Sequence, residues 1–131
     1  MSQQELEATL NRLQAGAGQP PTFSVESARA GWYSHADDFA IPDTLHQATT
    51  LTGAMKAEWL QSAELTPQRA VLYLHGGGYV CGSIESHRPL APAFAESFDC
   101  TVLSIDFRMA PEHPFPAAVE DAVAAYRYLL D

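Results

Sequence analysis

The chain has 131 residues, of which 47% are hydrophobic and 18% charged, and its formal net charge is −9. This length fits one domain and excludes two complete ones, and the apolar content excludes an intrinsically disordered chain. The seven Lys and Arg residues include a single lysine, Lys56, so the sequence offers no basic surface for nucleic acid. No stretch is typical of a membrane span or a signal peptide, so a cytoplasmic protein is expected.

The first segments predict two helices. Leu6, Leu10 and Leu13 recur at helical spacing, which predicts a helix over 3–13 that the Gly and Pro residues of 16–21 end. A second short helix is predicted within 24–39, where Gly31 is unfavourable. Neither helix can bury an apolar face alone, so both must lie on another part of the protein.

The middle of the chain predicts strands. Residues 46–60 read as an antiparallel hairpin that turns at Gly53. Residues 70–74 and 101–105 are apolar at nearly every position, which is typical of strands buried on both faces. Between them we expect one helix over 87–98, with Ser86 as its N-cap and a kink at Pro92. This order of strand, helix and strand predicts a βαβ unit with parallel strands.

One more helix is predicted to begin at Pro116, which suits a first helical position. Its apolar stripe consists of Val119, Val123, Tyr126 and Leu130. The two cysteines, Cys81 and Cys100, are too far apart for a Cys-x-x-Cys pair and are expected to be free thiols. The five histidines show no metal-ligand spacing, so no metal and no cofactor are expected.

Three consecutive glycines, Gly76 to Gly78, follow the first apolar strand directly and carry most of the functional information. Such a run is retained where the backbone needs conformations closed to other residues or must approach a ligand closely. No lysine follows as in a phosphate-binding P-loop, and no G-x-G-x-x-G opens a helix here. Two interpretations of the glycine run remain. One is a tight structural turn, and the other is an oxyanion hole, in which backbone N–H groups bind a developing negative charge.

At this point the chain resembles a known family. His75-Gly76-Gly77-Gly78, with an aromatic residue at Tyr79, is followed about thirty residues later by residues 106–118, which begin Asp106-Phe107-Arg108. Together these motifs resemble the hormone-sensitive-lipase family of α/β-hydrolases. The resemblance implies an α/β fold in which residues 1–45 form a helical cap. Residues 46–131 then form the first half of the hydrolase sheet, an antiparallel hairpin followed by a parallel βαβ unit with the glycine loop.

The resemblance also implies roles for individual residues. The amides of Gly77 and Gly78, with Gly76 as a further candidate, form part of the oxyanion hole, and His75 braces the loop without acting as a base. The substrate pocket is implied to be lined by Tyr79, Trp32 and Phe39. A structural polar cluster that supports the loop is implied to consist of Asp106, Arg108 and Glu112.

A serine hydrolase of this type needs a nucleophile elbow, G-x-S-x-G, and none of the nine serines lies in that pattern. We therefore expect the Ser-Asp-His triad beyond residue 131, and residues 1–131 alone to be inactive. The expected function is the N-terminal part of a carboxylesterase for short or medium acyl esters, completed by a C-terminal half on the same or a separate chain. The alternatives are a non-enzymatic small-molecule receptor and an inactive truncated partner on the same fold.

Overall fold

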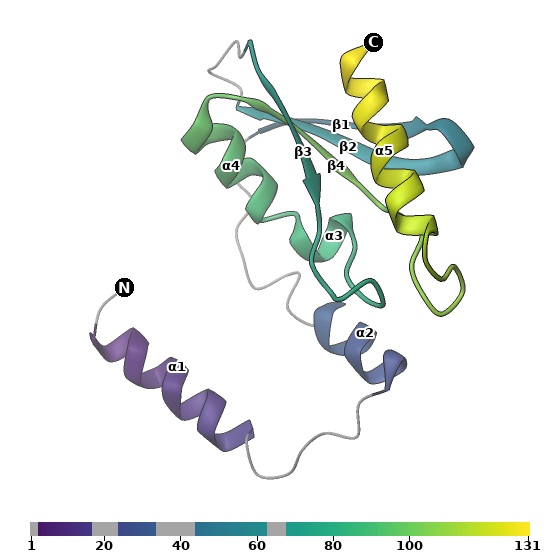
Figure 1. The fold of residues 1–131 in the computed structure, drawn as a ribbon. Helices are drawn as coiled ribbons and strands as arrows, with labels where there is room; N and C mark the ends of the chain where they lie inside the picture. Colours follow the sequence, from purple (N-terminus) through teal and green to yellow (C-terminus); the bar gives the residue numbers. More distant parts are fainter. Residues whose placement is uncertain (1–2, 17–23, 34–43, 63–67) are drawn as a thin grey trace.

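The computed structural model of the chain describes residues 3–16, 24–33, 44–62 and 68–131. They form a mixed four-stranded sheet with the strand order β1-β2-β4-β3 (Figure 1). In chain order the elements are α1 (Gln3–Gly16), α2 (Val25–Tyr33), β1 (Thr44–Leu51), the 3-10 turn η2 (Thr52–Ala54), β2 (Met55–Ser62), β3 (Ala70–Leu74), α3 (Ile84–His87), α4 (Leu90–Phe98), β4 (Thr101–Ile105) and α5 (Ala117–Leu130).

The predicted hairpin and the predicted βαβ unit are both confirmed. β1 and β2 pair antiparallel, and the chain turns between them at Gly53, whose φ of 76° favours glycine. β4 pairs antiparallel with β2 and parallel with β3. The glycine run therefore leaves the sheet at the carboxyl end of a parallel strand, beside β4.

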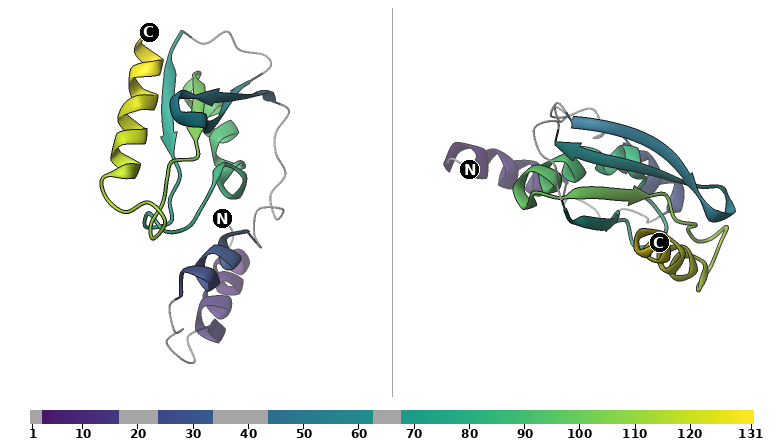
Figure 2. Two further views of the ribbon diagram at one scale, coloured as in Figure 1. Left: turned by 90° about the vertical axis from the view of Figure 1, so that its right-hand side faces the viewer. Right: turned by 90° about the horizontal axis from the view of Figure 1, so that it is seen from above.

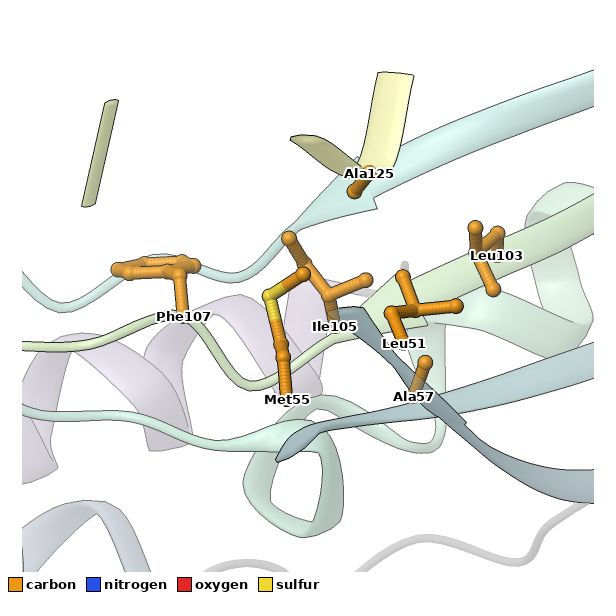
Figure 3. Packing of buried hydrophobic residues seen from close by; sticks show 7 residues of the cluster. All are labelled: Leu51, Met55, Ala57, Leu103, Ile105, Phe107 and Ala125. Carbon is orange, nitrogen blue, oxygen red and sulfur yellow. The ribbon is translucent and has the colours of Figure 1, made fainter. Parts of the chain in front are cut away.

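β4 lies between two helical layers. Its side chains alternate, so Leu103 and Ile105 pack with Met55 and Ala125 under α5 (Figure 3). Val102 lies in the other cluster, which includes Ala95 of α4. Figure 2 shows α5 on one face of the sheet and α3 and α4 on the other. The prediction of burial on both faces is correct for β4.

For β3 the same prediction is wrong. Among the described residues β3 pairs only with β4, and Val71 and Leu74 remain 37% and 44% exposed. The apolar side chains of β3 have a different explanation. β3 forms the edge of the described sheet and lies beside an apolar surface that no described residue covers.

The single helix predicted over 87–98 is two helices. α3 begins at Ile84, and its N-cap is Ser83, whose hydroxyl accepts from the Ser86 amide, so Ser86 is the third helical residue and not the cap. The helix breaks at Arg88 and Pro89. No kink occurs at Pro92, because Pro92 lies in the first turn of α4, where amide N–H groups have no intrahelical acceptor.

α5 begins at Ala117, one residue after Pro116, and packs on the sheet through small side chains. Ala117 and Ala125 are buried, and Ala118 and Leu129 contact the core cluster under α5. The predicted stripe is not the packed face. Its members are 43–68% exposed: Val119, Val123, Tyr126 and Leu130.

α1 and α2 lie beyond the carboxyl ends of the parallel strands (Figures 1 and 2). Leu6 and Leu10 of α1 are 43% and 46% exposed, so the described part of the chain leaves this apolar stripe uncovered. Within the described ranges, no helix is both long enough and apolar enough to cross a membrane.

Candidate active site

The candidate site is the loop from His75 to Gly82, which joins β3 to α3. In parallel sheets ligands bind beyond the carboxyl ends of the strands, which is where this loop lies. Its backbone has positive φ at Gly77 (126°), Gly78 (62°), Tyr79 (66°) and Gly82 (93°). A positive φ at Tyr79 is unfavourable for a residue with a side chain, so the surrounding contacts must hold the loop in place.

At two of these glycines a side chain would clash with neighbouring atoms, in addition to the unfavourable backbone conformation. A Cβ at Gly77 would lie 2.0 Å from the Cys81 carbonyl oxygen, and one at Gly82 would lie 2.3 Å from the Gly76 carbonyl oxygen. A Cβ at Gly78 would meet nothing within 4 Å. The loop is therefore folded tightly on itself at Gly77 and open at Gly78.

The Gly76 carbonyl is fixed by the residue before it. His75 Nδ1 lies 2.9 Å from the Gly76 oxygen, and because a carbonyl only accepts, this nitrogen carries the proton and donates. In a trans peptide the next N–H points away from the carbonyl. Fixing the Gly76 carbonyl therefore also fixes the direction of the Gly77 amide.

The Gly77 carbonyl is fixed in the same way by the end of the loop. The amides of Val80 and Cys81 both donate to the Gly77 oxygen at 3.2 Å, and the Cys81 thiol donates to it at 3.1 Å. The Gly78 amide, on the same peptide, then points away from the loop. Neither the Gly77 nor the Gly78 amide donates to any other group in the described part of the chain.

Gly76 differs from the other two glycines. Its amide donates to Nε2 of His87 at 3.3 Å, so it is not free to bind a ligand, and the expectation of Gly76 as a further donor is wrong. Since Nε2 accepts, the proton of His87 is on Nδ1, which donates to the Ser86 hydroxyl at 3.0 Å. Burial, with nearby His75 as a second cause, lowers the pKa of His87 and keeps the imidazole neutral.

His75 is 5% exposed and stacks on Phe107, with ring centroids 4.3 Å apart and an interplanar angle of 13°. Its Nε2 has no hydrogen-bond partner among the described residues. The stacking holds the ring in the orientation in which Nδ1 reaches Gly76.

The expected polar cluster does not form as one group, because its three members bind different segments. Asp106 accepts from the Ile84 amide at 2.7 Å and so anchors the start of α3, and burial raises the pKa of this carboxyl group. Glu112 accepts from Arg29 of α2 at 2.7 and 2.8 Å. Both contacts hold segments that adjoin the glycine loop.

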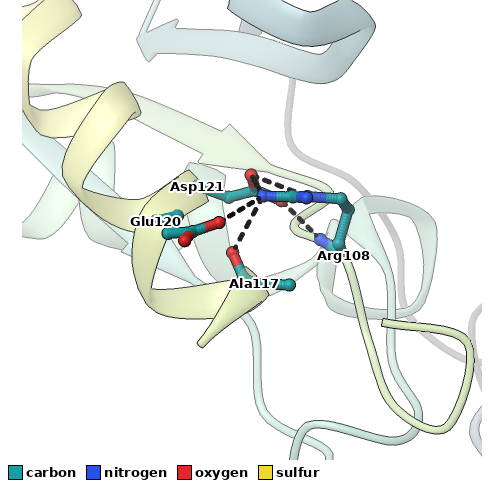
Figure 4. A network of polar contacts seen from close by, with 4 residues as sticks. All are labelled: Arg108, Ala117, Glu120 and Asp121. Atoms are coloured by element: carbon teal, nitrogen blue, oxygen red, sulfur yellow. Dashed lines mark hydrogen bonds and ion pairs between the residues drawn. The ribbon is translucent and has the colours of Figure 1, made fainter. Parts of the chain in front are cut away.

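Arg108 has no described contact with the loop. Its guanidinium and its amide both donate to Asp121, and Nη2 also donates to Glu120 and to the Ala117 carbonyl (Figure 4). These groups lie in the first turns of α5. Arg108 therefore fastens α5 to the segment after β4, and the expectation that it supports the glycine loop is wrong.

The three pocket residues expected from the resemblance have different positions. Tyr79 is 64% exposed and lines a groove of about 640 Å³ together with Gly77, Gly78 and Val123. The groove runs between β3 and the exposed stripe of α5 and is mostly apolar. The side chain of Trp32 and the whole of Phe39 lie outside what the structure describes.

Arg29 and Gly82 were not predicted as site residues, and His87 was expected only as the first residue of a helix. Arg29 gave no signal, because its partners lie 51 to 83 positions away. Gly82 carried a weak signal, since it follows the loop closely and precedes a Ser-x-x-Ser capping pattern. Among the described residues, no group of three or more His, Cys, Asp or Glu side chains is arranged to hold a metal ion.

Comparisons with known proteins agree with this geometry. A family model described as the α/β-hydrolase fold matches residues 71–131. An acetyl-hydrolase of Streptomyces hygroscopicus is 52% identical over 79 residues, which are 60% of this chain and 26% of that protein. The hormone-sensitive lipase of Bos taurus is 38% identical over 84 residues, which are 58% of this chain and 11% of that protein.

Solved structures match over almost the whole chain. An esterase from the bacterial hormone-sensitive-lipase family has a TM-score of 0.83 and 35% identity, and the match covers 99% of this chain and 43% of that one. The chain thus spans less than half the length of the relatives it matches. The chain therefore has the α/β-hydrolase fold, and the loop geometry and these matches make it similar to the hormone-sensitive-lipase family.

Proposed function

We propose that this chain is the N-terminal half of a serine carboxylesterase and supplies the oxyanion-hole loop. The observation that supports the proposal is the pair of adjacent amides, at Gly77 and Gly78, that are held in fixed directions and have no described acceptor. When a serine attacks an ester, the carbonyl oxygen becomes negative in the tetrahedral intermediate, and preorganised N–H donors stabilise that charge. The same donors act again when water attacks the acyl-enzyme.

The catalytic triad is proposed to lie on the other half of the fold, which we call the catalytic half. This chain holds no G-x-S-x-G elbow, and the matched relatives are more than twice its length. The free edge of β3 and the exposed stripe of α5 offer the catalytic half a strand edge for pairing and an apolar surface. "Complete enzyme" below means this chain together with that half.

The substrates are proposed to be small-molecule esters with short or medium acyl groups. The names of the matched relatives, an acetyl-hydrolase and esterases among them, support this class and do not favour the receptor or the inactive partner. Residues 1–45 are proposed to form a cap, because α1 and α2 lie beyond the carboxyl ends of the parallel strands, near the loop. The exposed ring of Tyr79 then lines the acyl pocket, with Trp32 and Phe39 as further lining residues. A cytoplasmic location stays a prediction.

A backbone substitution tests the oxyanion role directly. In the complete enzyme, Gly78→glycolic acid replaces the amide N–H with an ester oxygen and keeps the backbone free to adopt positive φ. Loss of one oxyanion donor lowers kcat by about 10²–10³-fold, and this loss is expected for p-nitrophenyl butyrate. The control is Gly76→glycolic acid, whose N–H binds His87, and it should lower kcat far less. Unchanged rates after replacement at both Gly77 and Gly78 would refute the proposal, as would hydrolysis by residues 1–131 alone.

A further inference from the structure

Arg29 of α2 joins three segments that are distant in the sequence. Its Nε donates to the Val80 carbonyl at 2.8 Å, and its Nη2 donates to the Ala110 carbonyl at 3.2 Å. Nη1 and Nη2 also donate to the two carboxylate oxygens of Glu112, at 2.8 and 2.7 Å. One side chain therefore fixes α2, the end of the glycine loop and the turn before α5 relative to one another.

The contact with Val80 continues into the candidate oxyanion hole. The Val80 amide donates to the Gly77 carbonyl, and that carbonyl sets the direction in which the Gly78 amide points. The preceding residue is held as well, because the Ala110 amide donates to the Tyr79 carbonyl at 2.9 Å. A movement of Val80 toward or away from α2 thus rotates the peptide that carries the Gly78 N–H.

Water partly screens the ion pair, because the Arg29 and Glu112 side chains are 30% and 54% exposed, so stability is not its main effect here. Arg29 lowers the pKa of Glu112 to about 2, so the carboxylate remains charged at any working pH. What the paired geometry provides is orientation, because a guanidinium bound at two oxygens has a fixed plane.

We propose that Arg29 is a positioning residue, through which α2 holds Val80 and so aims the Gly78 amide at the substrate carbonyl. This inference rests on the proposed function. Lysine cannot replace Arg29, since a single ammonium group cannot bind Val80, Ala110 and both oxygens of Glu112 at once. The cap thereby takes part in the chemistry at the loop, in addition to covering a pocket.

The test compares Arg29→Lys and Arg29→Gln with the unaltered complete enzyme. Misplacing one oxyanion donor should lower kcat for p-nitrophenyl acetate by about 10–100-fold and leave KM within about threefold. A trifluoromethyl ketone, which forms a tetrahedral adduct with the serine, should bind more weakly by the same factor as kcat/KM falls. The planar amide of the same carbon skeleton should bind equally well to all variants. Arg69→Gln is the matched control, because Arg69 donates to the Phe98 carbonyl, away from the loop, and no change is expected.

Two results would overturn the inference. One is an increase in KM with kcat unchanged, which indicates that Arg29 only anchors the cap. The other is equal weakening of the planar and tetrahedral inhibitors. Amide hydrogen exchange separates this inference from the proposed function, because the Val80 and Cys81 amides should exchange faster in Arg29→Gln whether or not the enzyme hydrolyses esters. An inactive parent enzyme would refute the esterase, whereas unchanged exchange would refute the role of Arg29.

Discussion

The directions of the Gly77 and Gly78 amides depend on side chains outside the glycine run. His75 holds the Gly76 carbonyl and His87 holds the Gly76 amide, so two imidazoles fix one residue from both sides. His87 can accept only while it is neutral, because an imidazolium has no acceptor nitrogen. The order of the glycine loop is therefore coupled to the protonation of a buried histidine.

This coupling predicts a pH dependence of stability. The pKa of His87 is lower in the folded protein than its ordinary value of about 6.5, so below that pH the unfolded chain binds a proton that the folded protein does not. The free energy of unfolding should fall as the pH decreases from about 7 to 5. His87→Gln retains an oxygen that can accept from Gly76 and does not titrate, so it should lose less stability over this range.

Urea unfolding of the complete enzyme and of His87→Gln checks this prediction. At about pH 8 residue 87 is neutral in both the folded and the unfolded states, so the difference there contains no contribution from its protonation. The gap between the two midpoints should then change as the pH falls, in favour of the variant. Parallel pH profiles for the two proteins would contradict the prediction.

The glycine run was predictable as bare backbone, because glycine adopts positive φ without strain. Which amides remain free was not predictable. The Gly76 amide donates to His87, which lies eleven positions later. The Gly78 amide is oriented through Val80 by Arg29, which lies far earlier in the chain. These contacts have no periodicity that a sequence pattern could reveal, which is why Gly76 was wrongly expected as a donor.

Among the elements, the short helix α3 has the greatest effect on the site. Ser83 and Ser86 each accept from the other's amide as a capping box, and the Ser86 hydroxyl oxygen also accepts a hydrogen bond from His87 Nδ1. Asp106 holds the Ile84 amide at the same helix end. The start of α3 therefore determines where His87 lies relative to Gly76.

This arrangement predicts that replacing Ser83 or Ser86 with alanine lowers the free energy of unfolding by different amounts. Ser83→Ala removes an N-cap and should lower the free energy of unfolding by about 1 kcal/mol. Ser86→Ala should cost more, because it removes the acceptor of the Ser83 amide as well as a hydrogen bond of His87 Nδ1, and a buried unpaired amide donor costs about 1–3 kcal/mol. Ser97→Ala, at an exposed position of α4, should change stability by less than about 0.5 kcal/mol. Denaturant titration measures all three, and an equal cost for Ser83→Ala and Ser86→Ala would contradict the double role of Ser86.

Among the secondary-structure elements, the strands were predicted from the sequence more accurately than the ends of the helices. β3 and β4 occupy the predicted residues, because uninterrupted runs of apolar side chains define their limits. The start of α3 was misplaced because Ser83 and Ser86 are both suitable caps and neither has a glutamate three residues later to distinguish it. The burial of β3 was wrong because burial depends on what lies beside a strand and not on the strand's own residues.

At the scale of the whole molecule, β3 and α5 together leave an apolar surface uncovered. Within the described sheet β3 has a free edge, and the exposed stripe of α5 lies across the groove from it. In the complete enzyme the catalytic half is proposed to cover both. In the chain alone they face water, and an exposed apolar edge strand promotes pairing with another chain.

The isolated chain is therefore expected to self-associate and to lack a sharply melting monomeric state, which light scattering after size exclusion and thermal circular dichroism can show. Val123→Glu places a charge in the exposed stripe, where Val123 is 43% exposed, and should shift the isolated chain toward monomer. The same substitution should destabilise the complete enzyme by more than about 2 kcal/mol, because there the charge would be buried. Ala93→Glu, an equal change of charge at an exposed position of α4, should do neither. Val123→Glu can favour the monomer of the isolated chain and also destabilise the complete enzyme only if the stripe is an internal surface of that enzyme. A stable, sharply melting monomer of residues 1–131 would show instead that β3 and α5 need no cover.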